Sequence, residues 1–118
     1  MVTGRSHVRT RLLTELGSNI SRWRTLQGLS ATVLAERAHI TRDTLRAIET
    51  GTGAPRIDSL LAVLLSLHMA NTVVASTDPW NSLAGRALMD ELIGTPNERR
   101  WMTEPPDGPI PIARRDDR

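Results

Sequence analysis

The sequence contains no cysteine and no lysine. Without cysteine the chain can form neither a disulfide nor a thiolate metal site, and it has no cysteine nucleophile, a composition that suits a reducing cytoplasm. No apolar run is long enough to span a bilayer, and the N-terminus lacks the basic-then-apolar pattern of a secretory signal. We therefore expect the 118 residues to form a soluble cytoplasmic protein with one compact domain and a tail.

The sequence motifs of common enzyme classes are also missing. The 3 histidines stand far apart, and the chain has no His-Glu-x-x-His zinc motif, no nucleophile elbow and no glycine-rich phosphate loop. Residues 49–55, ETGTGAP, resemble such a loop only superficially, because the lysine is absent. We expect no catalysis, no cofactor and no metal site.

The basic residues are all arginine, and they are concentrated in the first part of the chain. Residues 1–67 contain 9 arginines against 5 acidic residues, a net charge of +4, whereas residues 68–118 contain 6 against 8, a net charge of −2. Because the arginine guanidinium suits phosphates and guanine edges, the basic part would face an acidic partner. Codon usage in a GC-rich genome would also produce an excess of arginine.

Two segments have the periodicity of amphipathic helices, with apolar side chains every three or four positions. In residues 8–27 the stripe consists of Leu12, Leu13, Leu16, Ile20, Trp23 and Leu26. In residues 56–68 it consists of Ile57, Leu60, Leu61, Leu64, Leu65 and His68. The second segment is predicted to be the central core helix, with His68 half-buried at its boundary and not a ligand.

Two shorter helices are predicted between these segments. Gly28 ends the first long helix, Ser30 caps the helix SATVLAERA, and Thr41 caps a helix over TRDTLRAIET. The side chains expected to face the core are Leu34, Ala35, Ala38, Leu45 and Ile48. Residues 51–55, GTGAP, are predicted to form a loop in which two glycines permit positive φ. Because helices this short are marginal in isolation, they must pack on one another and on the flanking helices.

A helix, a tight turn and a second short helix with an outward polar side form the layout of a DNA-reading helix-turn-helix. In the second short helix the residues that lie away from the core are Arg42, Asp43, Arg46 and Ala47. The N-terminal end of this helix also offers free N–H groups and a positive dipole end to a phosphate. Two alternatives stay open. The arginines could instead pair with Asp43 or Glu49 on a solvated surface, and Asp43 could either accept from a cytosine or only stabilise the first turn.

Residues 16–69 resemble the five-helix DNA-binding domain of the lambda-repressor and Cro family, also called the xenobiotic-response-element family. The resemblance rests on LS before the first short helix, on LAERA, on TLRAIETG and on the proline followed by leucine repeats. It implies an all-α fold and base-reading roles for Arg42, Asp43, Thr44, Arg46 and Ala47. It also implies contacts to the DNA backbone from Ser30, Thr32, Thr41, Thr50 and Arg56.

The chain departs from the family pattern at three positions. Many members have glutamine where this chain has Ala31, and that glutamine helps to fix the recognition helix on the phosphate backbone, so the contact is lost or moves to Thr32. His39 stands where a glycine, often with a left-handed backbone, is common, and histidine tolerates this conformation at some cost. Arg56 replaces the serine or threonine that usually caps the fourth helix, which favours a phosphate contact by this arginine.

Beyond residue 69 the sequence predicts a helical extension. Residues 71–77, NTVVAST, fit either a short strand or a helical turn. Asp78 is predicted to cap a helix with Pro79 at its first position, continuing to Leu92. The apolar stripe of this helix is expected to mediate dimerisation and consists of Trp80, Leu83, Ala84, Ala87, Leu88 and Leu92.

The end of the chain has little to bury. Residues 95–98, TPNE, have the spacing of a capping box that would start another helix, and Trp101 would be either an exposed partner site or packed on the body. Residues 103–118 are rich in proline and charge and are predicted to be a tail, disordered in the free protein.

The sequence therefore predicts a DNA-binding domain over residues 8–69, a dimerising helical extension over 70–102 and a flexible tail over 103–118. The predicted function is a transcriptional repressor, bacterial or phage-encoded and nucleoid-associated, that binds an inverted-repeat DNA operator as a homodimer; a phage immunity repressor is one such protein. The alternative is an antitoxin that neutralises a protein toxin and autoregulates its operon. The segment ASTDPWNSLAGRALMDELIGTPNERR is similar to the segment that follows the same domain in actinobacterial regulators, including HipB-type antitoxin-repressors.

Overall fold

The computed structural model describes residues 6–92. Within this range all regular elements are helical, which confirms the predicted all-α fold. The chain divides into two compact units, Met1–Asn71 and Thr72–Arg118. The predicted capping box at residues 95–98, Trp101 and the predicted tail over 103–118 lie outside the described residues.

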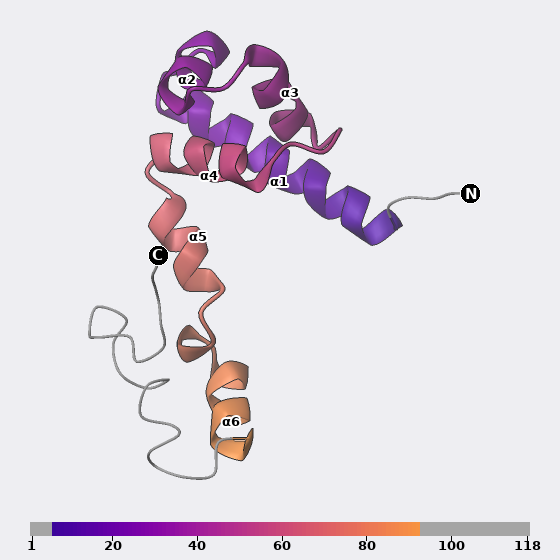
Figure 1. Cartoon of the computed structure of the whole chain (residues 1–118), viewed down its shortest axis with the longest axis vertical. Coiled ribbons are helices and arrows are strands. Elements are labelled where there is room, and N and C mark those ends of the chain that lie inside the picture. Colours follow the sequence, from indigo (N-terminus) through magenta and orange to yellow (C-terminus); the bar gives the residue numbers. More distant parts are fainter. Residues whose placement is uncertain (1–5, 93–118) are drawn as a thin grey trace. The chain divides into compact units, whose positions relative to one another are not determined.

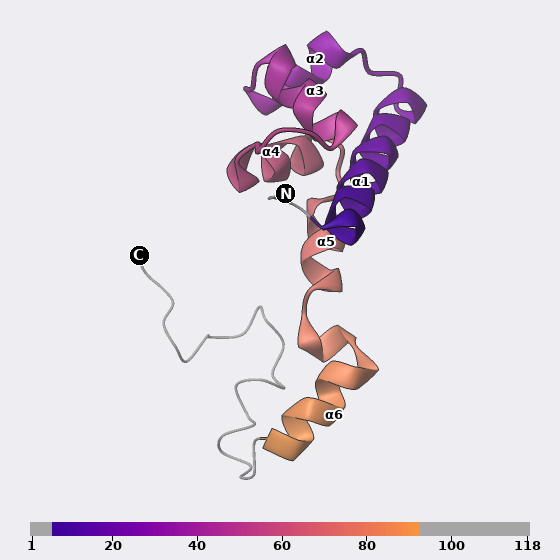
Figure 2. The same cartoon turned by 90° about the vertical axis from the view of Figure 1, so that its right-hand side faces the viewer.

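The first unit contains four helices, followed by the start of a fifth. They are α1 (His7–Leu26), α2 (Ala31–Ala38), α3 (Arg42–Thr50) and α4 (Ile57–Ser66), and α5 (Ala70–Ser76) crosses into the second unit. α1 packs on α3, while α2 packs on both α3 and α4. Figure 2 shows α2, α3 and α4 grouped along one side of α1.

The core of the first unit is made by aliphatic side chains from all four helices. The largest fully buried ones are Ile20, Leu34, Leu45, Val63 and Leu67. The five side chains that the sequence places in the core of the two short helices are all buried, so this prediction is confirmed. Burial of each large aliphatic side chain contributes about 1.5–3 kcal/mol.

α1 forms as predicted, but most of its apolar stripe does not lie in the core. Only Gly17 and Ile20 are buried in this helix, whereas Leu12, Trp23 and Leu26 are exposed, Leu26 by 77%. The reason is that α3 contacts α1 closely at one place: a Cβ on Gly17 would run into the carbonyl oxygens of Ile48 and Glu49. Of the six side chains in the stripe, Ile20 is buried, Leu13 is half-buried, and Leu12, Leu16, Trp23 and Leu26 are exposed.

The prediction of the buried face of α4 is also wrong for most of its residues. Ile57 is 85% exposed, Leu61, Leu65 and His68 are exposed, and the helix buries Val63 and Leu64. The segment LLAVLL is apolar on every side, so its periodicity does not select the face that meets α2. His68 is not a boundary residue of a core stripe but follows the helix with a left-handed backbone, φ 62°.

Over residues 79–92 the structure has two short helical elements instead of the one long helix predicted from Pro79 to Leu92. Residues 70–76 form α5, which settles the strand-or-helix alternative in favour of a helix. A three-residue 3-10 helix, η1 (Pro79–Asn81), then precedes α6 (Leu83–Leu92).

The break between η1 and α6 occurs at Ser82, which has an extended backbone. Asp78 caps the turn as predicted, since its Oδ1 accepts from the Trp80 N–H at 2.9 Å, but the turn closes after three residues. Ser82 Oγ then accepts from the Gly85 N–H at 3.1 Å and starts α6. The polar side chain of Ser82 therefore acts as a second cap that the sequence prediction overlooked.

Candidate nucleic-acid interface

A short turn joins α2 to α3 (Figure 1). It is built from capping side chains and one left-handed residue. Ser30 Oγ accepts from the Val33 N–H at 3.1 Å, and Thr41 Oγ1 accepts from the Thr44 N–H at 3.0 Å. His39 ends α2 with φ 56° and ψ 44°, the left-handed conformation expected at this position. The sequence predictions for these caps and for the turn are confirmed.

The loop after α3 also has the predicted backbone. Gly51 and Gly53 have φ values of 71° and 68°, which glycine adopts without strain. At Gly51 a Cβ would come within 2.7 Å of the Leu13 carbonyl group, so the loop passes against α1 where only glycine fits. This close approach fixes the C-terminal end of α3.

The outward side of α3 is polar. Leu45 and Ile48 are buried, while Arg42, Asp43 and Arg46 are exposed. Thr44 and Ala47, the two other residues predicted to read bases, are half-buried on the flanks of the helix. The helix therefore presents charged and hydrogen-bonding groups to solvent on one side, while its apolar side holds it to the core. The base-reading roles themselves remain predictions.

Arg42 is bound to the preceding helix. Its Nη1 donates to Thr32 Oγ1 at 2.6 Å, so a side chain at the start of α3 meets one in the first turn of α2. This contact brings together a predicted base-reading residue and a predicted backbone-contacting residue. Arg42 thus bonds to Thr32 and not to Asp43 or Glu49, the partners offered by the alternative interpretation of a merely solvated surface.

Glu49 is held by an arginine that the sequence prediction overlooked. Arg24 Nε and Nη2 donate to the two carboxylate oxygens of Glu49 at 2.8 and 3.1 Å, and Arg24 Nη1 donates to the Leu29 carbonyl oxygen at 3.0 Å. Only 18% of the Arg24 side chain and 12% of the Glu49 side chain is exposed. The position of Glu49, one turn after the buried Leu45, was the available signal that this carboxylate needs a partner.

The ion pair has an electrostatic consequence for Arg24. The hydrogen bonds that Arg24 donates to Glu49 raise the pKa of the Arg24 guanidinium, burial acts in the opposite direction, and the Glu49 charge adds to the increase. The guanidinium therefore stays charged near neutral pH, and the pair ties α3 to α1.

Beside α3 lies a surface hollow of about 370 Å³, which we call the arginine hollow. It is lined by Arg24, Ala31, Arg42, Asp43, Leu45, Arg46, Glu49 and Thr50. Because Glu49 neutralises Arg24, the two remaining arginines against Asp43 leave the hollow with a net charge of +1. The small side chain of Ala31 leaves room at its edge, so the hollow suits an anionic group such as a phosphate.

The residues predicted to contact the DNA backbone are all exposed, but they differ in what their side chains already bind. Ser30 and Thr41 are caps, and Thr32 accepts from Arg42. Thr50 Oγ1 donates to the Arg46 carbonyl oxygen of its own helix at 2.7 Å. Arg56 stands at the start of α4 without a side-chain capping bond, as expected from its departure from the family pattern. Their DNA contacts remain predictions.

The residues predicted to mediate dimerisation lie in the second unit and are mostly exposed. Leu83 is 86% exposed and Leu88 54%, and Ala84, Ala87 and Leu92 are exposed as well. Trp80 differs, because it is half-buried and the Arg86 guanidinium lies 4.7 Å from the centre of its ring. Arg86 Nε also donates to the Trp80 carbonyl oxygen at 2.7 Å, a contact that the sequence prediction overlooked.

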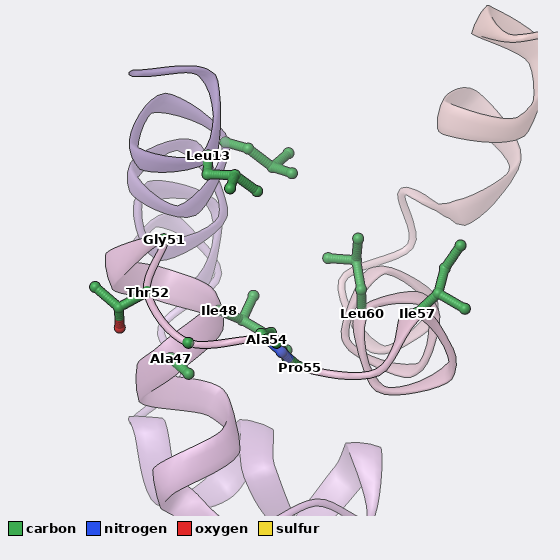
Figure 3. A pocket seen from close by; sticks show the side chains of 11 residues that line it. Leu13, Ala47, Ile48, Gly51, Thr52, Ala54, Pro55, Ile57 and Leu60 are labelled. Carbon is green, nitrogen blue, oxygen red and sulfur yellow. The ribbon is translucent and has the colours of Figure 1, made fainter. Parts of the chain in front are cut away.

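An apolar pocket of about 220 Å³ is lined by residues of α1, α3, α4 and the loop before α4 (Figure 3). Figure 3 shows Leu13 of α1 on one side, Ile57 and Leu60 of α4 on the other, and the loop through Ala54 between them. Its volume is below the roughly 300–1,000 Å³ typical of small-molecule sites. The pocket has room for about one large apolar side chain.

Other kinds of site are not found in the part of the chain that the structure describes. Over residues 6–92 no three histidine, aspartate or glutamate side chains gather in a way that could hold a metal ion. No helix in the same range is both long and apolar enough to cross a membrane.

Comparison with known proteins identifies the region that contains the candidate interface. A family model described as helix-turn-helix matches residues 20–67, from Ile20 in the second half of α1 to Leu67 just after α4. The matched range contains the turn, both capped helices, the Arg24–Glu49 pair and the arginine hollow. Searches of the curated proteins and of the solved structures returned no match to the chain.

Proposed function

We propose that this chain is a sequence-specific repressor acting as a homodimer on double-stranded DNA, a function supported by the match of residues 20–67 to a helix-turn-helix family model. The observation that carries this proposal is the outward side of α3, where Arg42, Asp43 and Arg46 are exposed on a helix anchored by Leu45 and Ile48. A helix of this kind fits the width of a DNA major groove.

The electrostatics of the site support DNA as the ligand. The arginine hollow has a net positive charge, and the Arg42–Thr32 bond links the first turns of α2 and α3, whose N-terminal ends each favour an anion. In this proposal Arg42 and Arg46 reach base edges, Asp43 accepts from a cytosine, and Thr44 and Ala47 make flanking contacts. Ser30, Thr32, Thr41, Thr50 and Arg56 bind phosphates.

The second unit supports the proposed homodimer. A single helix-turn-helix offers few base contacts, and paired recognition helices read two half-sites about 34 Å apart. α6 has apolar side chains at helical spacing that face solvent in the single chain, including Leu83 and Leu88. Pairing of two α6 helices would bury these side chains.

The proposal is tested by selecting binding sites from random double-stranded DNA at physiological salt, since lower salt lets phosphate contacts mask sequence preference. We expect an inverted repeat with half-sites about one helical turn apart. Absence of any enriched sequence, with a folded and soluble protein, would contradict the proposed function.

The exposed leucines of α6 also favour a second candidate, an antitoxin whose DNA binding is autoregulatory. Here the apolar surface of α6 would bind a toxin protein. A toxin gene beside the gene for this chain, and co-purification of the two products as a stable complex, would support this candidate. A chain that binds its operator and forms only homodimers when co-expressed with the neighbouring gene products would count against it.

A further inference from the structure

The hydrogen bond between Arg42 and Thr32 constrains a side chain that would otherwise be mobile. Arg42 is exposed and is the first residue of α3, and an exposed arginine samples many rotamers. Its Nη1 donates to Thr32 Oγ1 at 2.6 Å, a short bond in which the donor is charged. The two residues are 10 positions apart and belong to different helices, so the bond is a tertiary contact.

We infer that Thr32 is a positioning residue, which holds the Arg42 guanidinium in the orientation used to read a base. This inference rests on the proposed function. A guanidinium has five N–H groups, and the bond to Thr32 occupies one of them. The remaining N–H groups include the pair on the other edge of the fork, which can donate together to the O6 and N7 atoms of a guanine.

Thr32 is suited to this role by its chemistry and its neighbours. Its hydroxyl accepts the Arg42 N–H without adding a charge that would compete with DNA for the guanidinium. The adjacent Ala31 has no polar group, so Thr32 supplies the hydrogen bond from the first turn of α2. Because Thr32 is β-branched, its own χ1 angle is restricted, and the oxygen that Arg42 meets is held in a defined place.

This arrangement predicts which property of DNA binding depends on Thr32. A residue that only binds a phosphate changes the affinity for every sequence alike, because phosphates carry no sequence information. A residue that positions a base-reading arginine changes the ratio between the affinities for selected and random DNA. Preorganisation of Arg42 lowers the entropy lost on binding the correct base, and this advantage is absent on the wrong base.

The test measures that ratio for the full chain with the operator obtained by selection and with random-sequence DNA as probes. Thr32→Val keeps the shape of the side chain and removes the acceptor, and we expect the ratio to fall about 5- to 10-fold, the effect of one typical solvent-exposed hydrogen bond. Thr32→Ser keeps the hydroxyl and should retain most of the ratio. Thermal unfolding checks that both variants fold like the original chain.

A double-mutant cycle separates positioning from an independent DNA contact. In an Arg42→Ala background, Thr32→Val should leave the ratio unchanged, because the side chain that Thr32 positions is gone. Thr25→Val is the matched control, since the exposed Thr25 hydroxyl donates to the Ser21 carbonyl oxygen of its own helix and not to Arg42. This control should leave the ratio unchanged in both backgrounds.

Two results would overturn the inference while leaving the proposed function intact. The first is an equal loss of affinity for selected and random DNA in Thr32→Val, which would make Thr32 a plain phosphate contact. The second is a reduction of the ratio by Thr32→Val that persists in the Arg42→Ala background. If the unaltered chain shows no sequence preference, the proposed function fails, and the inference about Thr32 fails with it.

Discussion

The pair α2–α3 and the pair η1–α6 are built alike at their ends and differ in what their sides contact. In each pair a capping hydroxyl or carboxylate starts the elements, with Ser30 and Thr41 in the first and Asp78 and Ser82 in the second. The first pair buries apolar side chains from both helices. In the second pair α6 buries only Met89 among the described residues, and its leucines face solvent.

This comparison separates two properties that the sequence determines: where a helix begins and what its sides contact. Capping side chains determine where helices begin, because the bonds they make are local. The side chains between the caps determine what each helix can bind. An outward polar side suits nucleic acid, whereas an outward apolar side such as that of α6 suits another protein surface.

The largest effect on the free energy of unfolding is expected for a substitution of Gly17, where α1 meets α3. Gly17→Ala should lower the free energy of unfolding by about 3 kcal/mol, because the added Cβ meets backbone carbonyls that cannot move aside. This cost exceeds the gain of about 1 kcal/mol in helix propensity. Denaturant unfolding followed by circular dichroism measures the change.

The matched variant in the second unit is Gly85→Ala, where a Cβ would run into the Pro79 backbone. It should disturb α6 without changing the unfolding transition of the first unit. An unchanged stability for Gly17→Ala would contradict the close crossing of α1 and α3.

The next effect concerns the ion pair between α1 and α3. Glu49→Gln should lower the free energy of unfolding by about 2 kcal/mol, less than for a fully buried pair, because the edges of both side chains still meet water. The control is Glu15→Gln, which removes the exposed pair with Arg11 and should cost less than about 0.5 kcal/mol. Equal effects of the two substitutions in thermal unfolding would contradict the structural role of Glu49.

The contribution of Arg24 to folding stability depends on pH in one direction only. The pKa of Arg24 is raised in the folded chain, so its stabilisation is complete below the pKa of the unfolded state and is lost only as the pH rises through the folded value, in strong alkali. We therefore expect Arg24 to contribute no pH dependence near neutrality. Proton release by Arg24 in a titration near neutral pH would contradict this expectation.

DNA binding should distinguish two arginines of the first unit. Arg42→Ala should weaken binding to the selected operator by about 1–3 kcal/mol and relax one base preference, whereas Arg56→Ala should weaken all sequences alike and reduce the salt dependence. Competition binding with selected and random DNA measures both. Equal losses on the two DNAs for Arg42→Ala would remove it from the base-reading set.

The smallest effect on folding stability is expected on the exposed side of α6, which differs most from the buried sides of α2 and α3. Replacing Leu83 and Leu88 together by serine should change the free energy of unfolding of the single chain by less than about 0.5 kcal/mol, since both side chains are solvent-exposed there. The same variant should shift the proposed homodimer to monomer in analytical ultracentrifugation. A dimer of unchanged strength would assign dimerisation to another surface.

Local features of the fold were predictable from the sequence, and long-range ones were not. Caps such as Ser30 and Thr41 and the left-handed turn at His39 depend on a few adjacent residues. The buried face of α4 was mispredicted because its leucines surround the helix, and only the partner α2 decides which of them are covered.

The candidate site follows the same division. Exposure of Asp43 and Arg46 could be predicted, because at helical spacing their positions point away from the face that carries Leu45 and Ile48. The contacts made by these helices could not, because the Arg24–Glu49 bonds join residues 25 positions apart and the Arg42–Thr32 bond joins residues 10 positions apart. Such contacts depend on how the helices pack, which periodicity within one helix does not encode.

The shielding of the Arg24–Glu49 pair sets how ionic strength would act on this protein. Dissolved ions weaken contacts between exposed arginines and DNA phosphates, but they screen a largely buried pair far less. Added salt should therefore weaken DNA binding at the proposed interface, while α3 keeps its position on α1. Ionic strength would therefore change the fraction of protein bound to DNA and leave the conformation of the proposed DNA-binding surface unchanged.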